Sequence, residues 1–132
     1  MKFNTLFRKK LTQSLKYKST GSIAEEIACQ YLQQQKLTLV IQNYHCQRGE
    51  IDIIMRDKDT LVFIEVKYRA NNRHGTPIEA IHYHKLQKIK STIEHYIMTN
   101  NLGYIPCRID VIGLHGNLQQ PDINWVKNIV ID

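Results

Sequence analysis

The sequence predicts an α/β domain in which a central mixed β-sheet is flanked by helices, with the element order αβββαββ. Two observations carry this prediction. Segments with apolar residues at helical spacing alternate with short runs rich in β-branched and aromatic residues. The length of 132 residues also suits one hydrophobic core rather than two. We therefore expect residues 19–132 to form a single domain and residues 1–18 to form a basic N-terminal tail.

The first expected helix runs from about Ser22 to about Lys36. Ser22 is suited to the N-cap position, and Glu25 follows it at the spacing of a capping box. Ile23 and Ile27 then place apolar side chains on one face of the helix. Glu25 has two readings on spacing alone: a capping acid, or a carboxylate that belongs to a functional site.

Three strands are expected to follow this helix. The segment 37–44 is rich in β-branched residues, and the segments 50–55 and 61–67 are separated by a polar turn at 57–60. Because that turn is short, the second and third strands should form an antiparallel hairpin. The third strand is an almost continuous apolar run, which is typical of a strand buried on both faces.

A polar loop at 69–76 leads to a second helix, predicted from Pro77 to about Thr99. Proline suits the first turn of a helix, and apolar residues follow at helical spacing. A fourth strand is expected at 106–113 and a last one, at an edge of the sheet, at 123–131. Arg108 and Asp110 share one face of the fourth strand and are expected to pair with each other.

Charge and hydropathy narrow the class of protein. Eighteen Lys and Arg residues against 12 Asp and Glu residues give a net charge of +6, which favours a polyanionic partner. No apolar run approaches the roughly 18 residues of a membrane span, and the basic start lacks the apolar core of a secretory signal. We therefore expect a cytoplasmic protein. The tail is either loosely structured or a basic arm that lies along nucleic acid or a membrane surface.

Three charged residues in the predicted hairpin carry the functional signal. Side chains alternate along a strand, so Glu65 and Lys67 share a face while Val66 points to the other. Asp52 joins them if the hairpin register places its carboxylate opposite Glu65. Two carboxylates at the end of a hairpin form a hard-oxygen site that suits Mg²⁺ or Mn²⁺. A structural ion pair would explain Glu65 and Lys67, but it gives no reason for Asp52.

This set of residues suits hydrolysis of a phosphodiester bond. A metal held by Asp52 and Glu65 would neutralise charge on the phosphate and acidify its bound water. Lys67 would orient or deprotonate that water, or stabilise the charge of the transition state. Glu25 could hold a second metal or part of its water shell. Arg69, Lys85 and Lys88 are candidate contacts for nucleic-acid phosphates, although a solvated surface explains them equally well.

These residues resemble a known family. The pattern consists of Gly21-x-x-x-Glu25-x-x-Ala28, Asn43, Gly49-Glu-Ile-Asp-Ile-Ile54, Val62-Phe-Ile-Glu-Val-Lys67-x-Arg69, Gly75-x-Pro77, Lys85 and Arg108-Ile-Asp110-Val111. It is similar to the YraN-type family, also called UPF0102, over roughly residues 19–131. That family in turn resembles the restriction-endonuclease-like PD-(D/E)xK superfamily and especially archaeal Holliday-junction resolvases. The resemblance implies a site of Glu25, Asp52, Glu65 and Lys67 with Mg²⁺ as cofactor.

Three functions are compatible with the sequence. The first is a Mg²⁺-dependent endonuclease that acts on DNA, including branched or structured DNA. A resolvase cuts two strands symmetrically, so that version predicts a homodimer. The second is a non-catalytic nucleic-acid-binding module on the same fold. The third is an assembly factor whose charged cluster merely stabilises the sheet, and the intact set of Asp52, Glu65 and Lys67 argues against it.

Overall fold

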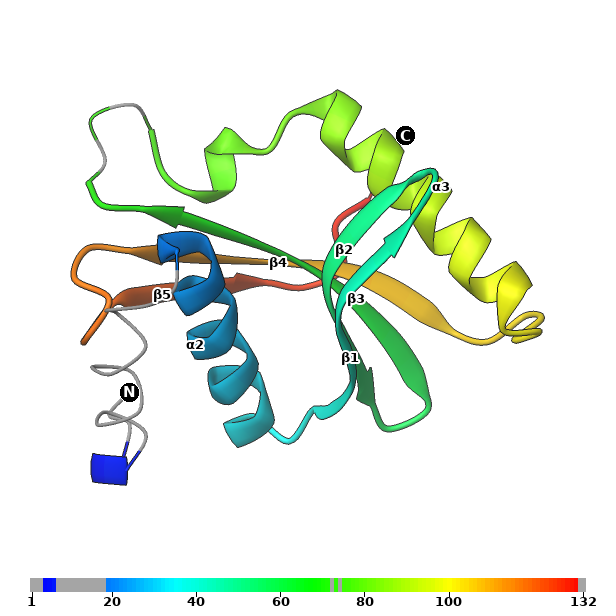
Figure 1. Cartoon of the computed structure of the whole chain (residues 1–132), viewed down its shortest axis with the longest axis horizontal. Coiled ribbons are helices and arrows are strands. Elements are labelled where there is room, and N and C mark those ends of the chain that lie inside the picture. The colour runs from blue at the N-terminus through cyan, green and yellow to red at the C-terminus, as the bar shows by residue number, and fades with distance from the viewer. Residues whose placement is uncertain (1–3, 7–18, 72, 74, 131–132) are drawn as a thin grey trace.

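The computed structural model describes residues 4–6, 19–71, 73 and 75–130. Its elements are α2 (Thr20–Gln34), β1 (Thr38–Cys46), β2 (Gly49–Asp57), β3 (Thr60–Arg69), the 3-10 helix η1 (Ile78–Ala80), α3 (Tyr83–Thr99), β4 (Cys107–His115) and β5 (Asp122–Val126). This confirms the α/β class and the order αβββαββ, an arrangement consistent with a nuclease-like core (Figure 1). Most of the predicted basic tail, 1–18, lies outside the described residues. In the described part of the chain, no helix is long and apolar enough to span a membrane.

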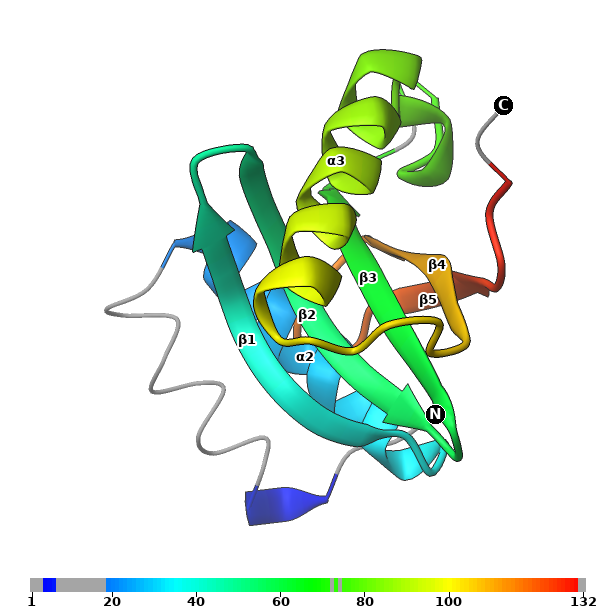
Figure 2. The ribbon, with the colours of Figure 1, turned by 90° about the vertical axis from the view of Figure 1, so that its right-hand side faces the viewer.

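The five strands form one mixed sheet in the order β1-β2-β3-β4-β5. Only the β3–β4 pair is parallel among these strands, and the other neighbours are antiparallel. A parallel pair needs a crossover connection, which η1 and α3 provide. Figure 2 shows α3 in front of the sheet and α2 behind it. The sheet therefore lies between two layers, each holding one of these helices.

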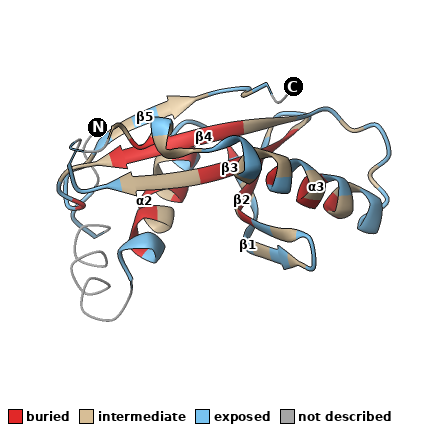
Figure 3. Cartoon of the chain, turned by 90° about the horizontal axis from the view of Figure 1, so that it is seen from above, coloured by how far each residue is buried: buried red, intermediate tan, exposed pale blue. Residues whose placement is uncertain are grey.

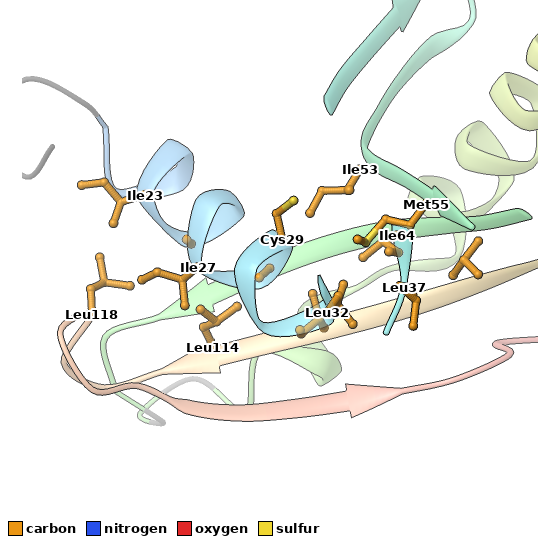
Figure 4. Packing of buried hydrophobic residues seen from close by; sticks show 14 residues of the cluster. Ile23, Ile27, Cys29, Leu32, Leu37, Ile53, Met55, Ile64, Leu114 and Leu118 are labelled. Carbon is orange, nitrogen blue, oxygen red and sulfur yellow. The ribbon is translucent and has the colours of Figure 1, made fainter. Parts of the chain in front are cut away.

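The face behind the sheet packs against α2. Its buried side chains come from the apolar stripe of the helix and from alternate positions of the central strands (Figure 4). Ile27 and Leu32 are fully buried there against Ile53, Ile64 and neighbouring residues. This packing fixes the position of α2, and with it the position of Glu25, on the sheet.

The opposite face packs against α3. Phe63 lies in contact with Tyr96 in an edge-to-face arrangement, with ring centroids 5.8 Å apart, and Ile89 and Ile93 complete the contact. Figure 3 shows buried residues along the central strands and on the helix faces that meet the sheet. Because β3 is covered on both faces, its run from Leu61 to Glu65 is buried throughout, as its apolar sequence predicts.

The first helix begins earlier than the sequence predicts. Its N-cap is Ser19, whose hydroxyl accepts a hydrogen bond from the backbone N–H of Ser22 at 3.2 Å. The prediction of Ser22 as the cap is therefore wrong. Glu25 then lies in the second turn, too far along the helix for a capping box, and its carboxylate is left for other contacts.

The second helix is interrupted rather than continuous from Pro77. Ile78–Ala80 form one 3-10 turn, Ile81 and His82 are extended, and α3 starts at Tyr83. The predicted start at Pro77 is wrong because this segment first packs over β4. A Cβ added to Gly113 would lie only 3.0 Å from the Cβ of Pro77, so glycine at this position permits the close approach.

The last strand is shorter than the predicted range 123–131. It ends at Val126, and Asn128 then adopts a positive φ of 58°. The backbone N–H of Asn128 donates to Asp110 at 2.9 Å, so the chain turns to meet a buried carboxylate instead of extending the sheet. The last residue of the predicted strand, Ile131, lies outside the described residues.

Candidate active site

The site forms where β2 and β3 separate. Their pairing ends at Ile53 and Ile64, although both strands continue beyond that pair. The next residues in the antiparallel register are Asp52 and Glu65. The carboxylate of Asp52 accepts a hydrogen bond from the backbone N–H of Val66 at 2.8 Å. The Asp52 side chain thus accepts a hydrogen bond that a neighbouring strand would otherwise accept. This bond fixes the Asp52 carboxylate between the two strands.

Three carboxylates from three elements meet at this point. The Asp52 side chain is within hydrogen-bonding reach of Glu25 from α2 and of Glu65 from β3. Glu65 is only 4% exposed, whereas Glu25 and Asp52 are partly buried. The structure therefore brings together the acidic residues that the sequence predicts as one site. They include Glu25, for which spacing alone gives two readings.

Burial and mutual repulsion hold protons on this cluster. Burial, the charge of Asp52 and the hydrogen bond to it raise the pKa of Glu25 from 4.5 to about 8. Burial and Asp52 also raise the pKa of Glu65, to about 7, although Lys85 and Lys67 oppose the shift. Neighbouring carboxylates that share protons in this way are typical of acid–base and metal sites, and also of some structural clusters.

Two lysines approach Glu65 from different elements. The ammonium of Lys67 lies 3.9 Å from Oε1 of Glu65, and the ammonium of Lys85 lies 3.6 Å from the same oxygen. Lys67 has the predicted place on the face of Glu65. The sequence predicts Lys85 only as a contact for nucleic acid, yet its ammonium also pairs with Glu65 of the carboxylate cluster. Sequence spacing gives no signal for this contact, because it depends on how α3 docks on the sheet.

Two cavities flank the cluster. One, of about 230 Å³, is lined by residues that include Glu25 and Asp52, and the other, of about 330 Å³, by residues that include Lys85 and Lys88. Both are bordered by Glu50 and His45, which form an exposed pair at 3.1 Å. The first cavity therefore exposes two of the three carboxylates, whereas the second is lined by two lysines and by none of the three.

Arg69 lies away from this arrangement. It is exposed at the last position of β3, two residues beyond Lys67, and alternation places it on the same face as Lys67. Its position suits a contact at the rim of the site. The structure gives it no closer link to the carboxylates, so its role in binding nucleic acid stays a prediction.

The donor set can be compared with the needs of a divalent cation. Glu25, Asp52 and Glu65 provide only carboxylate oxygens, which Mg²⁺ and Mn²⁺ prefer. Among the residues that the structure describes, no three His, Cys, Asp or Glu side chains stand in an arrangement that would hold a metal ion as they are. The carboxylates contact one another instead. The donor set suits such a cation, which would displace the shared protons because carboxylate ligands must be deprotonated.

The raised pKa values predict a stability that depends on pH in the absence of divalent cations. Unfolding returns both glutamates to a pKa near 4.5, so the folded state holds the protons more tightly. Their contribution to stability is therefore complete below about pH 4.5 and is lost as the pH rises through 7 to 8. We expect the melting temperature, measured in EDTA, to fall between pH 6 and pH 9.

The matched control for this prediction is the double variant Glu25→Gln, Glu65→Gln. Glutamine keeps the shape of each side chain and can still donate to Asp52, but it does not titrate. We expect its melting temperature to change much less over the same range. An equal fall in the wild type and in the double variant would show that other groups cause the pH dependence.

Comparison with known proteins places the chain among relatives of similar length. The family described as "Uncharacterised protein family UPF0102" matches residues 24–114. A UPF0102 protein of Colwellia psychrerythraea is 44% identical over 110 residues, covering 82% of this chain and 85% of the relative. A UPF0102 protein of Psychromonas ingrahamii is 47% identical over 111 residues, covering 83% and 88%. One of Legionella pneumophila is 44% identical over 109 residues, covering 82% and 91%. The matched region contains Glu25, Asp52, Glu65, Lys67 and Lys85, and the chain belongs to the UPF0102 family.

Proposed function

We propose that this protein is a Mg²⁺-dependent endonuclease that hydrolyses phosphodiester bonds in DNA. One observation carries the proposal: three carboxylates and two lysines, from four separate elements, converge at the point where β2 and β3 separate. A charged cluster at the end of a buried strand is costly to maintain for stability alone. It is well suited to a reaction in which negative charge moves between a water, a phosphate and a leaving group.

Each residue has a definite task in this proposal. Asp52 and Glu65 would hold the cation, with Glu25 as a further ligand or as a partner of its water shell. When bound, Mg²⁺ would neutralise the phosphate and acidify a water molecule. Lys67, 34% exposed and next to Glu65, would donate hydrogen bonds to the attacking water or to a phosphate oxygen. The backbone N–H of Val66 keeps Asp52 in place through its hydrogen bond.

DNA is the proposed substrate because the protein is basic and because Lys85 and Lys88 line a cavity beside the carboxylates. The test is a panel of linear, single-stranded, flapped and four-way DNA substrates, each incubated with Mg²⁺, with Mn²⁺ and with EDTA. We expect cleavage of at least one substrate that requires a divalent cation. Preference for the four-way substrate would further predict a homodimer in solution. We expect the protein to act in the cytoplasm.

A non-catalytic nucleic-acid-binding module is the second candidate. It is favoured by one observation, namely that the carboxylates contact one another and are not arranged to hold a cation. It predicts binding to DNA that weakens steeply with salt, and no turnover of any substrate in the panel under Mg²⁺ or Mn²⁺. Turnover that requires a divalent cation and an intact Asp52 would exclude it.

A further inference from the structure

Lys85 is positioned between the carboxylate cluster and the lysine-lined cavity. Its ammonium lies 3.6 Å from Oε1 of Glu65, nearer than that of Lys67, and it also borders the cavity that contains Lys88. The separation from Glu65 is longer than the roughly 2.8 Å of a direct charge-assisted hydrogen bond, so the pair is loose. The side chain is 36% exposed and carries a flexible four-carbon stem, so it can leave Glu65 at little cost.

A divalent cation and Lys85 would compete for the same oxygen atoms. Glu65 is nearly buried, and a positive charge beside it is needed whenever it is ionised. A bound cation would supply that charge and would repel the ammonium of Lys85 at short range. The displaced ammonium then has the neighbouring cavity to enter, where the exposed Lys88 lies one helical turn further along α3.

We propose that Lys85 exchanges partners: it neutralises Glu65 when no divalent cation is bound, and it binds a DNA phosphate when one is. The inference rests on the proposed function and deepens it, because it couples cation binding to substrate binding through one side chain. The coupling is reciprocal: if a bound cation increases the affinity for DNA, then bound DNA increases the affinity for the cation by the same factor. Lys88 contributes to the phosphate contact alone; within the described residues it forms no ion pair.

Two measurements test the exchange on the full chain, with Lys85→Ala, Lys85→Arg and Lys88→Ala compared with the wild type. The first is calorimetric titration with Mg²⁺ at pH 8.5 without DNA, where protons compete least for the carboxylates. Because Lys85 opposes the cation, we expect Lys85→Ala to bind Mg²⁺ about threefold or more tightly. Lys85→Arg keeps the charge and Lys88→Ala leaves Glu65 untouched, so both should stay within about twofold of the wild type.

The second measurement is binding of a short fluorescein-labelled DNA duplex, followed by anisotropy with Ca²⁺ or with EDTA. Ca²⁺ is bound by the same kind of oxygen ligand. The wild type, Lys85→Arg and Lys88→Ala should bind the duplex more tightly with Ca²⁺ than with EDTA. In Lys85→Ala this gain should be lost, whereas Lys88→Ala should weaken binding by a similar factor, about two- to tenfold, in both buffers.

The outcomes separate this inference from the proposed function. If the wild type binds Mg²⁺ but Lys85→Ala binds it equally or more weakly, the partner exchange is wrong while the nuclease proposal stands. A wild type that takes up no Mg²⁺ would overturn both. Thermal melting of each variant checks its fold; Lys85 is in the first turn of α3, where alanine and arginine are both good helix formers.

Discussion

Replacing Asp52 with alanine is expected to abolish metal-dependent cleavage of DNA, with a loss of about 10³-fold or more in rate. Asp52 is the carboxylate that contacts both Glu25 and Glu65, so its removal deprives the site of its central ligand. Lys67→Ala should give a loss of similar size without a loss of Mg²⁺ binding. The measurement is the cleavage rate on the best substrate of the panel, with enzyme in excess. Cleavage that survives both changes would come from another site or from a contaminant.

Asp52→Asn provides the matched control, because Asp52 also has a structural role. Its carboxylate accepts the hydrogen bond of the Val66 N–H, and alanine would leave that group without its partner. Asparagine can still accept the hydrogen bond while removing the charge. We expect Asp52→Asn to be as inactive as the alanine variant, yet more stable than the wild type at pH 9 in EDTA, since repulsion among the carboxylates is relieved. A variant that is inactive and also less stable would indicate that the charge supports the fold.

The largest effect on stability is expected from Asp110→Ala, which should lower the free energy of unfolding by about 3–5 kcal/mol. Asp110 is fully buried, as its side chain has no exposed surface. It accepts hydrogen bonds from Nε of Arg108 at 3.0 Å, from Nε1 of Trp125 at 3.0 Å and from the backbone N–H of Asn128 at 2.9 Å. Its removal would leave all three donors, one of them a largely buried cation, without this partner.

Urea unfolding of Asp110→Ala beside two milder variants measures this contribution. Trp125→Phe removes a single donor and should cost about 1 kcal/mol. Asp57→Ala removes a partner of Arg108 that is 30% exposed, 3.0 Å from its guanidinium, and should also cost about 1 kcal/mol. A loss in Asp110→Ala no greater than in these two variants would contradict the account of Asp110 as the centre of the network.

Local sequence patterns predict most of the fold, whereas the features that they do not predict depend on tertiary contacts. Alternation and helical spacing predict the sheet and both helices. The interruption of the second helix could not be foreseen, because it arises where Pro77 packs against Gly113 of a strand far along the chain. The early end of β5 likewise depends on a carboxylate, that of Asp110, which the residues after the strand turn to meet. The pairing of Arg108 with Asp110, expected from the strand face they share, is confirmed.

In the candidate site, too, local patterns predict some features and tertiary contacts determine the others. Strand alternation predicts that Glu65 and Lys67 are neighbours, and the short turn predicts that Asp52 lies opposite Glu65. The hydrogen bond from Val66 to Asp52 has no signal in the sequence, because it exists only where the two strands separate. The contact of Lys85 with Glu65 also has no signal in the local sequence, because Lys85 lies on α3, in the crossover between β3 and β4. Sequence patterns can thus identify the acidic residues of the site, but identifying the lysine that neutralises their charge requires the three-dimensional structure.

The central claim is that Glu25, Asp52 and Glu65 hold a divalent cation, and the most direct test is a crystal of the full chain soaked in millimolar Mn²⁺ at pH 8.5. Anomalous scattering distinguishes a bound Mn²⁺ ion from an ordered water molecule. The account predicts a peak between Asp52 and Glu65, with an oxygen of each roughly 2.1–2.2 Å away. It would be contradicted by crystals in which Mn²⁺ occupies other positions while the three carboxylates remain in contact with one another.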